Sequence, residues 1–205
     1  MHLIDRYMPN HQFSEQHFIN ITASCNIVMQ AILNYKPEDD AFFRSMIAIR
    51  EMPTRIAAHL KRRSIRNEYF GIHDFFLLGR DGNSEITFGL IGKLWQPDYG
   101  KLLFDNADSF VGFHEPGFAK LILNYRIDKI SREKIRLSTE TRVFCTDKKA
   151  VYCFFPYWCL IRPASGLIRR RILSAIKKTS EAHQEAHQKD RILTNSSHPR
   201  QNKID

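Results

Sequence analysis

The sequence is that of a basic chain of moderate length. It has 205 residues, of which 43% are hydrophobic and 12% aromatic, and its 31 Lys and Arg against 22 Asp and Glu give a formal net charge of +9. A folded chain of this length buries roughly 70% of the surface that its unfolded form exposes, so a sizeable core is available. With only 9 Gly, 8 Pro and 4 Cys, the composition excludes a fully disordered chain, a collagen and a disulfide-stapled mini-protein.

The apolar segments are too short for export or for membrane insertion. Asp5 and Arg6 interrupt the N-terminal stretch, where a secretory signal needs an unbroken apolar run. The longest nearly uninterrupted apolar run, residues 150–161, contains Pro156 and is shorter than the about 20 residues of a spanning helix. The cysteines form no Cys-x-x-Cys pair, which indicates reduced thiols. We therefore expect a cytoplasmic protein with a single domain over residues 1–180.

The first elements are a strand and two short helices. Apolar residues occupy mainly the odd positions of residues 13–23, which predicts an amphipathic strand. Residues 25–35 carry apolar side chains at helical spacing and predict the first helix. The run PEDD at residues 37–40 places a proline and acidic side chains at the start of the second helix, which Pro53 ends or kinks.

Strands dominate the middle of the chain. The Asp81-Gly82 step predicts a hairpin between strands at residues 70–78 and 85–95. Further strands are expected at residues 109–114, 118–127 and 134–145. Pro116-Gly117 is expected to form a bulge or corner within a long strand. In the last strand polar and apolar residues alternate, which predicts one covered face and one wet face.

A long helix follows the last strand. Apolar residues recur every three or four positions from Val151 to Ala175, and this is the longest element expected in the chain. Pro156 and Pro163 lie inside the helix, so we expect a bend. Residues 181–205 are polar and have almost nothing to bury, which predicts a disordered C-terminal tail.

The order of these elements resembles that of the START-like helix-grip fold. More specific are the runs HEPGFAK (114–120) with Asn124-Tyr125, LSTETRV (137–143) followed by CTD (145–147), and YWCLIRPASGLIRR (157–170). Together these runs resemble an uncharacterised bacterial branch of the SRPBCC superfamily, which contains START-like and polyketide cyclase-like proteins. The resemblance extends over residues 12–181.

The resemblance implies an α+β helix-grip fold, in which a curved antiparallel sheet wraps around the long C-terminal helix and encloses a hydrophobic pocket. Members of the superfamily use such a pocket for lipid or polyketide binding, for ring closure or for partner regulation. One local departure is the run AVYCFFP at residues 150–156, where the branch has basic residues. This departure predicts an unusually adhesive surface at the start of the helix.

The expected pocket is lined by the covered strand faces and by the helix. Thr and Tyr hydroxyls among apolar walls are typical of a small-molecule site, in which a few polar groups orient a mainly apolar ligand. The candidate ligand-binding residues are Phe88, Leu90, Leu123, Tyr125, Thr139, Thr141, Phe154 and Trp158. The same side chains can also make a solid core, and both interpretations stay open.

No residue pattern indicates a catalytic centre, a metal site or a cofactor. Glu140 and Arg142 lie on the other strand face from the pocket threonines, which favours a structural ion pair. His114 and Glu115 precede a Pro-Gly turn and have no third partner. A phosphate-binding glycine loop and a serine nucleophile elbow are both absent from the sequence. We therefore assign no catalytic residue, no metal and no cofactor.

Positive charge is clustered at residues 61–66 and along the final helix. The cations expected to form a basic surface on the helix are Arg162, Arg169, Arg170, Arg171, Lys177 and Lys178. A basic helix with an aromatic start is typical of peripheral contact with an anionic membrane, where each nearby cation adds about 1 kcal/mol. The aromatic residues precede the cations and do not alternate with them, so no nucleic-acid partner is expected. Cations that are merely solvated are the other interpretation.

The sequence thus predicts a protein that binds a hydrophobic or amphiphilic small molecule, lipid-like or polyketide-like, without transforming it. Apolar walls would remove ligand surface from water at about 25 cal/mol per Å², and Tyr125, Thr139 and Thr141 would orient the ligand. Two alternatives stay open. One is a cyclase-like or dehydratase-like enzyme that uses the same pocket, and the other is a membrane-surface or protein-interaction module that uses the basic helix.

Overall fold

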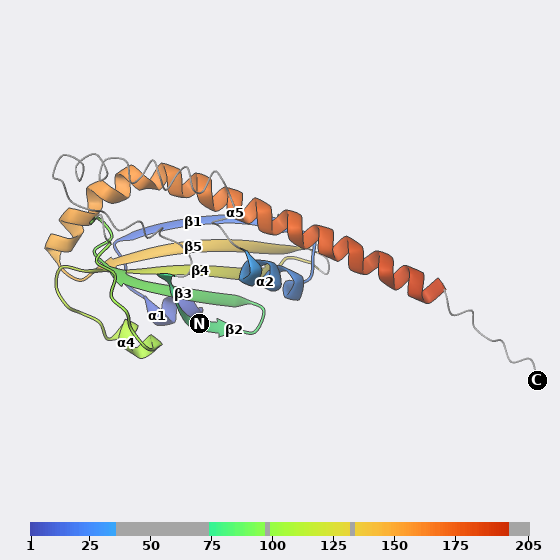
Figure 1. The fold of residues 1–205 in the computed structure, drawn as a ribbon, viewed down its shortest axis with the longest axis horizontal. Helices are drawn as coiled ribbons and strands as arrows, with labels where there is room; N and C mark the ends of the chain where they lie inside the picture. Colours follow the sequence, from blue (N-terminus) through green and yellow to red (C-terminus); the bar gives the residue numbers. More distant parts are fainter. Residues whose placement is uncertain (36–73, 97–98, 132–133, 197–205) are drawn as a thin grey trace, which may run out of the picture.

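The computed structural model describes residues 1–35, 74–96, 99–131 and 134–196, with side chains as far as residue 190. The elements follow in the order α1 (Leu3–Tyr7), β1 (Phe13–Ile21), α2 (Cys25–Asn34), β2 (Phe76–Asp81), β3 (Glu85–Gly92), α4 (Ala107–Val111), β4 (Ala119–Lys129), β5 (Ile135–Cys145) and α5 (Lys148–Ser196). Together they make an α+β protein with an antiparallel sheet and a long C-terminal helix (Figure 1). The helix expected from residue 37 and the basic cluster at 61–66 lie outside the described residues.

The strands form one five-stranded antiparallel sheet in the order β1-β5-β4-β3-β2. Strand β5 pairs with β1 on one side and with β4 on the other, so Thr139 is opposite both His17 and Tyr125. Because side chains alternate between the faces of a strand, these three residues form a row across one face of the sheet. The expected strands at 13–23, 118–127 and 134–145 are confirmed, and so is the hairpin at Gly82.

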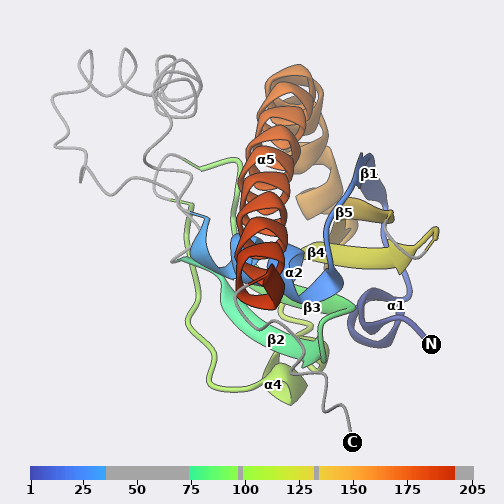
Figure 2. The same cartoon turned by 90° about the vertical axis from the view of Figure 1, so that its right-hand side faces the viewer.

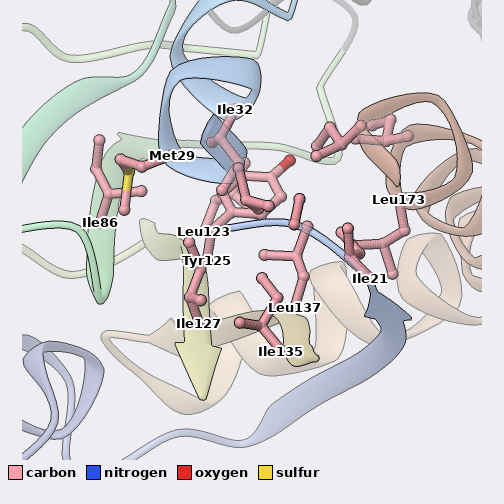
Figure 3. Packing of buried hydrophobic residues seen from close by; sticks show 14 residues of the cluster. Ile21, Met29, Ile32, Ile86, Leu123, Tyr125, Ile127, Ile135, Leu137 and Leu173 are labelled. Atoms are coloured by element: carbon pink, nitrogen blue, oxygen red, sulfur yellow. The ribbon is translucent and has the colours of Figure 1, made fainter. Parts of the chain in front are cut away.

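Helix α5 lies on this same face and completes two apolar clusters. It contacts mainly β1, α2 and β5, and Figures 1 and 2 both show it running beside β1. The first cluster joins α2, the sheet and the middle of α5 (Figure 3), and its buried members are Ile21, Ala23, Val28, Met29, Ile32, Ile86, Leu123, Tyr125, Ile127, Ile135, Leu137, Ile172, Leu173 and Ile176. The second lies under the start of α5 and contains Leu90, Leu94, Ala119, Val143, Cys145, Ala150, Phe154 and Trp158.

The first part of α5 is curved, as its two prolines predict. Pro156 and Pro163 lie inside the helix, and each removes one backbone donor from the ladder of hydrogen bonds. Figure 1 shows the orange first part of α5 bent and its red later part straight. The bend lets the start of the helix follow the edge of the sheet above the second cluster.

The opposite face of the sheet is covered over β2, β3 and part of β4 and β5 but exposed at β1 and at Arg136, which corrects the expectation of a wet face in part. Helices α1 and α4 pack there on a third apolar cluster: Ile4, Met8, Leu78, Ile91, Phe110 and Ile122. Two charged residues of β5 on this face, Glu140 and Arg142, hold α1. Arg142 donates from Nη1 to Asp5 Oδ1 over 2.8 Å and from Nε to Glu140 Oε1 over 2.6 Å. The alternation in β5 therefore marks a polar attachment site for a helix, which strand periodicity alone does not distinguish from a solvated face.

The prediction of a strand at residues 109–114 is wrong, because residues 107–111 form helix α4. The Asn106 side chain accepts a hydrogen bond from Ser109 N over 2.7 Å and caps the helix. Such a cap satisfies one of the backbone donors that have no partner at a helix start. Pro116-Gly117 likewise forms a turn before β4 and no bulge within a strand, with Gly117 at φ +83.

Helix α5 continues through Ser196, past residue 181, where a disordered tail was expected to begin. The first polar residues of this segment have partners. Thr22 N donates to Glu181 Oε1 over 2.9 Å and Ser24 N donates to Gln184 Oε1 over 3.1 Å. The final turns extend past the end of the sheet (Figure 1). Within the described ranges, every helix is too short or too polar to span a bilayer.

Candidate functional site

A group of polar side chains separates the two apolar clusters under α5. We call this group the polar belt; it comprises Glu15, His17, Tyr125, Thr139 and Arg169. In β1, Glu15 and His17 lie between Phe13 of the second cluster and Ile19 of the first. In β5, Thr139 and Thr141 lie between Leu137 and Val143 in the same way. The change from apolar to polar therefore occurs at the same level in neighbouring strands.

Tyr125 and Thr139 form the inner part of the polar belt. Both are almost completely buried, with exposed fractions of 2% and 1%. The Tyr125 phenol forms side-chain hydrogen bonds with Thr139 and Arg169. Burial raises the pKa of Tyr125, and the nearby Arg169 charge opposes this shift only in part. The phenol is therefore neutral at ordinary pH and keeps a proton that it can donate.

Arg169 brings a positive charge from α5 to the sheet. Its guanidinium Nη1 donates to Thr139 Oγ1 over 3.3 Å. Among the described residues no carboxylate forms an ion pair with Arg169. The carboxylate of Glu15, in the neighbouring part of β1, is paired with His17 instead. A guanidinium beside two hydroxyl groups is well suited to bind an anionic or carbonyl oxygen.

Glu15 and His17 form the outer part of the polar belt, at the edge strand. His17 Nε2 lies 2.7 Å from Glu15 Oε1, and the exposed fractions of the two side chains are 17% and 9%. Helix α5 comes close because Gly166 has no side chain: a Cβ there would be 3.0 Å from Glu15 Oε1. An imidazole hydrogen-bonded to a carboxylate can accept and return a proton.

Sequence reasoning missed the contribution of β1 and of α5 to the polar belt. Glu15 and His17 occupy odd positions of β1, which is the face that Phe13, Ile19 and Ile21 bury. The signal that could have indicated a polar site here was therefore the presence of two ionisable residues on the apolar face of an amphipathic strand. Pairing with Thr139 and Thr141 could not be read from the sequence, because β1 and β5 are far apart along the chain.

The predicted ligand-binding residues divide between the two apolar clusters. Phe88, Leu123 and Tyr125 belong to the first cluster or pack on it, whereas Leu90, Phe154 and Trp158 belong to the second. Phe154 and Trp158 pack on each other with ring centroids 5.9 Å apart, and Phe13 of β1 lies 5.0 Å from Phe154. Thr139 lies in the polar belt, and Thr141 lies opposite Glu15 in the adjacent strand.

The predicted basic surface is only partly exposed. Arg162, Arg170, Arg171 and Lys178 are exposed, whereas Arg169 and Lys177 are half-buried. Lys177 Nζ lies 3.8 Å from Glu181 Oε1, one helical turn further on. Arg169 differs from its neighbours because its position on the helix turns it toward Thr139, so it belongs to the polar belt and not to the outer surface.

The other candidate residues lie away from the polar belt. Glu140 and Arg142 are on the opposite face, where Arg142 also donates to Met8 O over 3.1 Å and so fastens α1. His114 and Glu115 are exposed in the turn before β4. In the part of the chain that the structure describes, no three His, Cys, Asp or Glu side chains gather in a way that could hold a metal ion.

No family model and no curated protein matches the chain. The hypothetical protein jhp0584 from Helicobacter pylori aligns with 82% of this chain and 86% of its own, at 8% identity and a TM-score of 0.34. TTHA0849 from Thermus thermophilus aligns with 85% of this chain and 99% of its own, at 8% identity and a TM-score of 0.28. Both likenesses are too distant to carry a conclusion about function.

Proposed function

We propose that this chain is a helix-grip protein of the SRPBCC type that binds an amphiphilic small molecule between the sheet and α5. The polar group of the ligand would be held by the polar belt, and its apolar part would lie against the neighbouring apolar clusters. The observation that carries the proposal is the half-buried guanidinium of Arg169, which hydrogen-bonds Thr139 and Tyr125 and has no carboxylate partner among the described side chains.

The physical reason is the cost of an unbalanced charge in an apolar interface. A charged group away from water is stabilised only when it is paired or well hydrogen-bonded. Neutral hydroxyls satisfy some of the Arg169 donors, but they do not balance its charge. A ligand carboxylate or phosphate would do so, and the neutral Tyr125 phenol could donate a further hydrogen bond.

The apolar walls would supply most of the affinity. Burial of ligand surface contributes about 25 cal/mol per Å², whereas the polar contacts orient the ligand. The long aromatic and aliphatic side chains on either side of the polar belt, such as Trp158 and Ile172, are suited to an alkyl chain or a fused ring system. This combination favours an anionic amphiphile over a purely apolar or a purely polar compound.

A direct test compares a fluorescent fatty acid, dansyl-undecanoic acid, with the matching alcohol. The parent protein is expected to bind the acid more tightly than the alcohol. Arg169→Gln should weaken binding of the acid by roughly 10- to 100-fold, because a hydrogen bond to a charged group contributes about 1.5–3 kcal/mol. Arg170→Gln is the matched control, since Arg170 is the exposed neighbour, and it should leave both affinities unchanged.

Two results would contradict the proposal. One is equal loss of affinity in Arg169→Gln and Arg170→Gln, which would indicate a nonspecific charge effect. The other is the absence of binding together with the absence of any retained compound after solvent extraction and mass spectrometry of the freshly purified protein. A retained compound would in addition identify the ligand directly.

The Glu15–His17 pair supports a second candidate function, a cyclase-like or dehydratase-like enzyme. The imidazole would accept a proton from a ligand held at Arg169, and the carboxylate 2.7 Å away would stabilise the resulting imidazolium. For this function His17→Gln must abolish turnover of the extracted compound and retain its binding. Turnover that survives His17→Gln would remove the pair from consideration.

A further inference from the structure

The outer face of the first half of α5 is apolar and exposed. We call the exposed residues of this face the outer stripe; they are Tyr152, Phe155, Pro156, Cys159, Leu160, Pro163 and Leu167. They recur every three or four positions, so they form one continuous band along the helix. The band lies opposite Phe154 and Trp158, which are buried against the sheet.

Among the described residues the outer stripe is largely uncovered, and a ring contact joins its Phe155 to Phe13, with centroids 6.4 Å apart. Its large side chains are substantially exposed: Tyr152 77%, Leu160 66%, Phe155 55% and Leu167 50%. A helix that packs on a sheet with one face normally presents charged and polar residues on the other. Single exposed apolar residues are common, but a contiguous band is typical of an interaction surface.

Cations flank the outer stripe at both ends, and acidic residues are absent between Asp147 and Glu181. Lys148 and Lys149 precede the stripe and are exposed. After Leu167 the same helical spacing leads to Arg170 and Lys178, which are exposed as well. The face therefore combines an apolar centre with a strongly positive border. A matching partner would have an anionic outer layer and an apolar layer beneath it.

We infer that the outer stripe docks on an anionic lipid bilayer at the level of the headgroups. Aromatic and aliphatic side chains would enter the boundary between headgroups and acyl chains, and the cations would contact lipid phosphates. A nucleic acid would neutralise the cations but leave the apolar band in water. A second copy of the chain would cover the band but bring two sets of cations together, which is unfavourable.

The prolines limit how deep the helix can lie. Pro156 and Pro163 lack the backbone N–H that would bond the carbonyls of Tyr152 and Cys159, four residues earlier. A carbonyl without a partner needs water or a headgroup donor, because the hydrocarbon core offers none. The stripe therefore fits the hydrated interface and not the centre of a bilayer, which agrees with α5 being no spanning helix.

Vesicle sedimentation tests this inference. The parent protein should sediment with vesicles of phosphatidylcholine and phosphatidylglycerol and stay in the supernatant with pure phosphatidylcholine. Replacement of Lys149, Arg170 and Lys178 by Gln should reduce the partition coefficient roughly 100-fold, since each cation near the surface contributes about fivefold. Phe155→Ser with Leu160→Ser should abolish binding to the anionic vesicles as well. All these side chains are exposed, and circular dichroism and thermal unfolding of each variant check that it folds like the parent.

Matched controls lie on β1 and β5, on the sheet face away from α5. Phe18 is an exposed aromatic residue at 63%, and the Arg136 guanidinium lies 5.0 Å above its ring. Phe18→Ser and Arg136→Gln remove the same kinds of side chain and should leave vesicle binding unchanged. A second measurement uses Cys159, which is exposed within the stripe: an environment-sensitive fluorophore there, in a Cys25→Ser and Cys153→Ser background, should shift to the blue on anionic vesicles.

Three outcomes would overturn the inference. One is equal binding to neutral and anionic vesicles, and another is loss of binding in the β1 and β5 controls to the same extent as in the stripe variants. The third is that the parent protein does not bind vesicles but binds a duplex oligonucleotide or associates with itself, and that the stripe substitutions remove that binding or association. None of these measurements involves the polar belt, so a failure here is independent of the proposed small-molecule site.

Discussion

Gly166 of α5 lies directly over the Glu15 carboxylate of β1. A Cβ atom at position 166 would be 3.0 Å from Glu15 Oε1 and 3.6 Å from His17 Cε1. The glycine therefore allows the helix to approach the edge strand at the point where polar side chains interrupt the apolar contact. The geometry of the polar belt depends on this close approach.

Gly166→Leu is expected to lower the free energy of unfolding by about 1–3 kcal/mol, because overpacking moves the helix or forces strained side-chain conformations. Urea denaturation measures the change. Ser174→Leu is the control, since it introduces the same side chain at an exposed position of the same helix and should change stability by less than about 0.5 kcal/mol. In a Glu15→Ala background the cost of Gly166→Leu should fall, and an unchanged cost would show that another contact is responsible.

The covered face of the sheet could be predicted from the sequence because its signals are local. The alternation in β5 and the helical spacing in α5 depend on neighbouring residues, and they identified the two elements that pack together. Tyr125 and Thr139 were selected for the same reason, as polar residues on faces that the alternation marked as covered. Strand pairing then brings them side by side.

The packing of α1 and α4 on the sheet face away from α5 could not be predicted, because it depends on contacts between residues that are far apart along the chain. Helix α1 is only five residues long, and its attachment depends on Glu85, whose Oε2 accepts a hydrogen bond from Leu3 N over 3.0 Å. No pattern within residues 1–10 indicates that this segment contacts Glu85, far along the chain. Arg142 was recognised as part of an ion pair with Glu140, but its contact with Asp5 depends on where α1 lies.

The attachment of α5 to the sheet is tested by Ile176→Ala. Ile176 is 1% exposed and belongs to the first apolar cluster. Its truncation should cost about 2–5 kcal/mol, from lost burial and from the cavity that remains. Leu167→Ala, on the exposed side of the same helix, should cost less than about 0.5 kcal/mol. Similar unfolding free energies for the two variants would mean that α5 is not held on the sheet.

The cap of α4 makes a separate prediction. Asn106→Ala removes the acceptor for Ser109 N and should cost about 0.5–2 kcal/mol, measured by thermal or urea unfolding. Asp105→Ala changes the preceding exposed residue and serves as the control. Asn106→Asp keeps the acceptor and should retain the stability of the parent. If Asn106→Ala were as stable as Asp105→Ala, capping would not explain why this segment is helical.

Lys120 of β4 makes the stability of the protein depend on pH. Its side chain is buried under α4, where Nζ donates to Val111 O over 2.9 Å and lies 5.0 Å from the ring centroid of Phe110. Desolvation lowers the pKa of Lys120 to about 8, whereas an unfolded lysine has a pKa of about 10.4. Between these two values the unfolded chain binds more protons than the folded chain, so this residue makes the free energy of unfolding rise with pH.

Lys120→Met keeps the length of the side chain and removes its titration. The free energy of unfolding of the parent, relative to this variant, should therefore increase as the pH rises from about 8 toward 10.5, and it should be constant below about 7. Chemical denaturation at a series of pH values measures both proteins side by side, and titrations common to the two cancel in the difference. A difference that is constant over the whole range would mean that hydrogen bonding to the α4 carbonyls compensates the ammonium for its lost hydration.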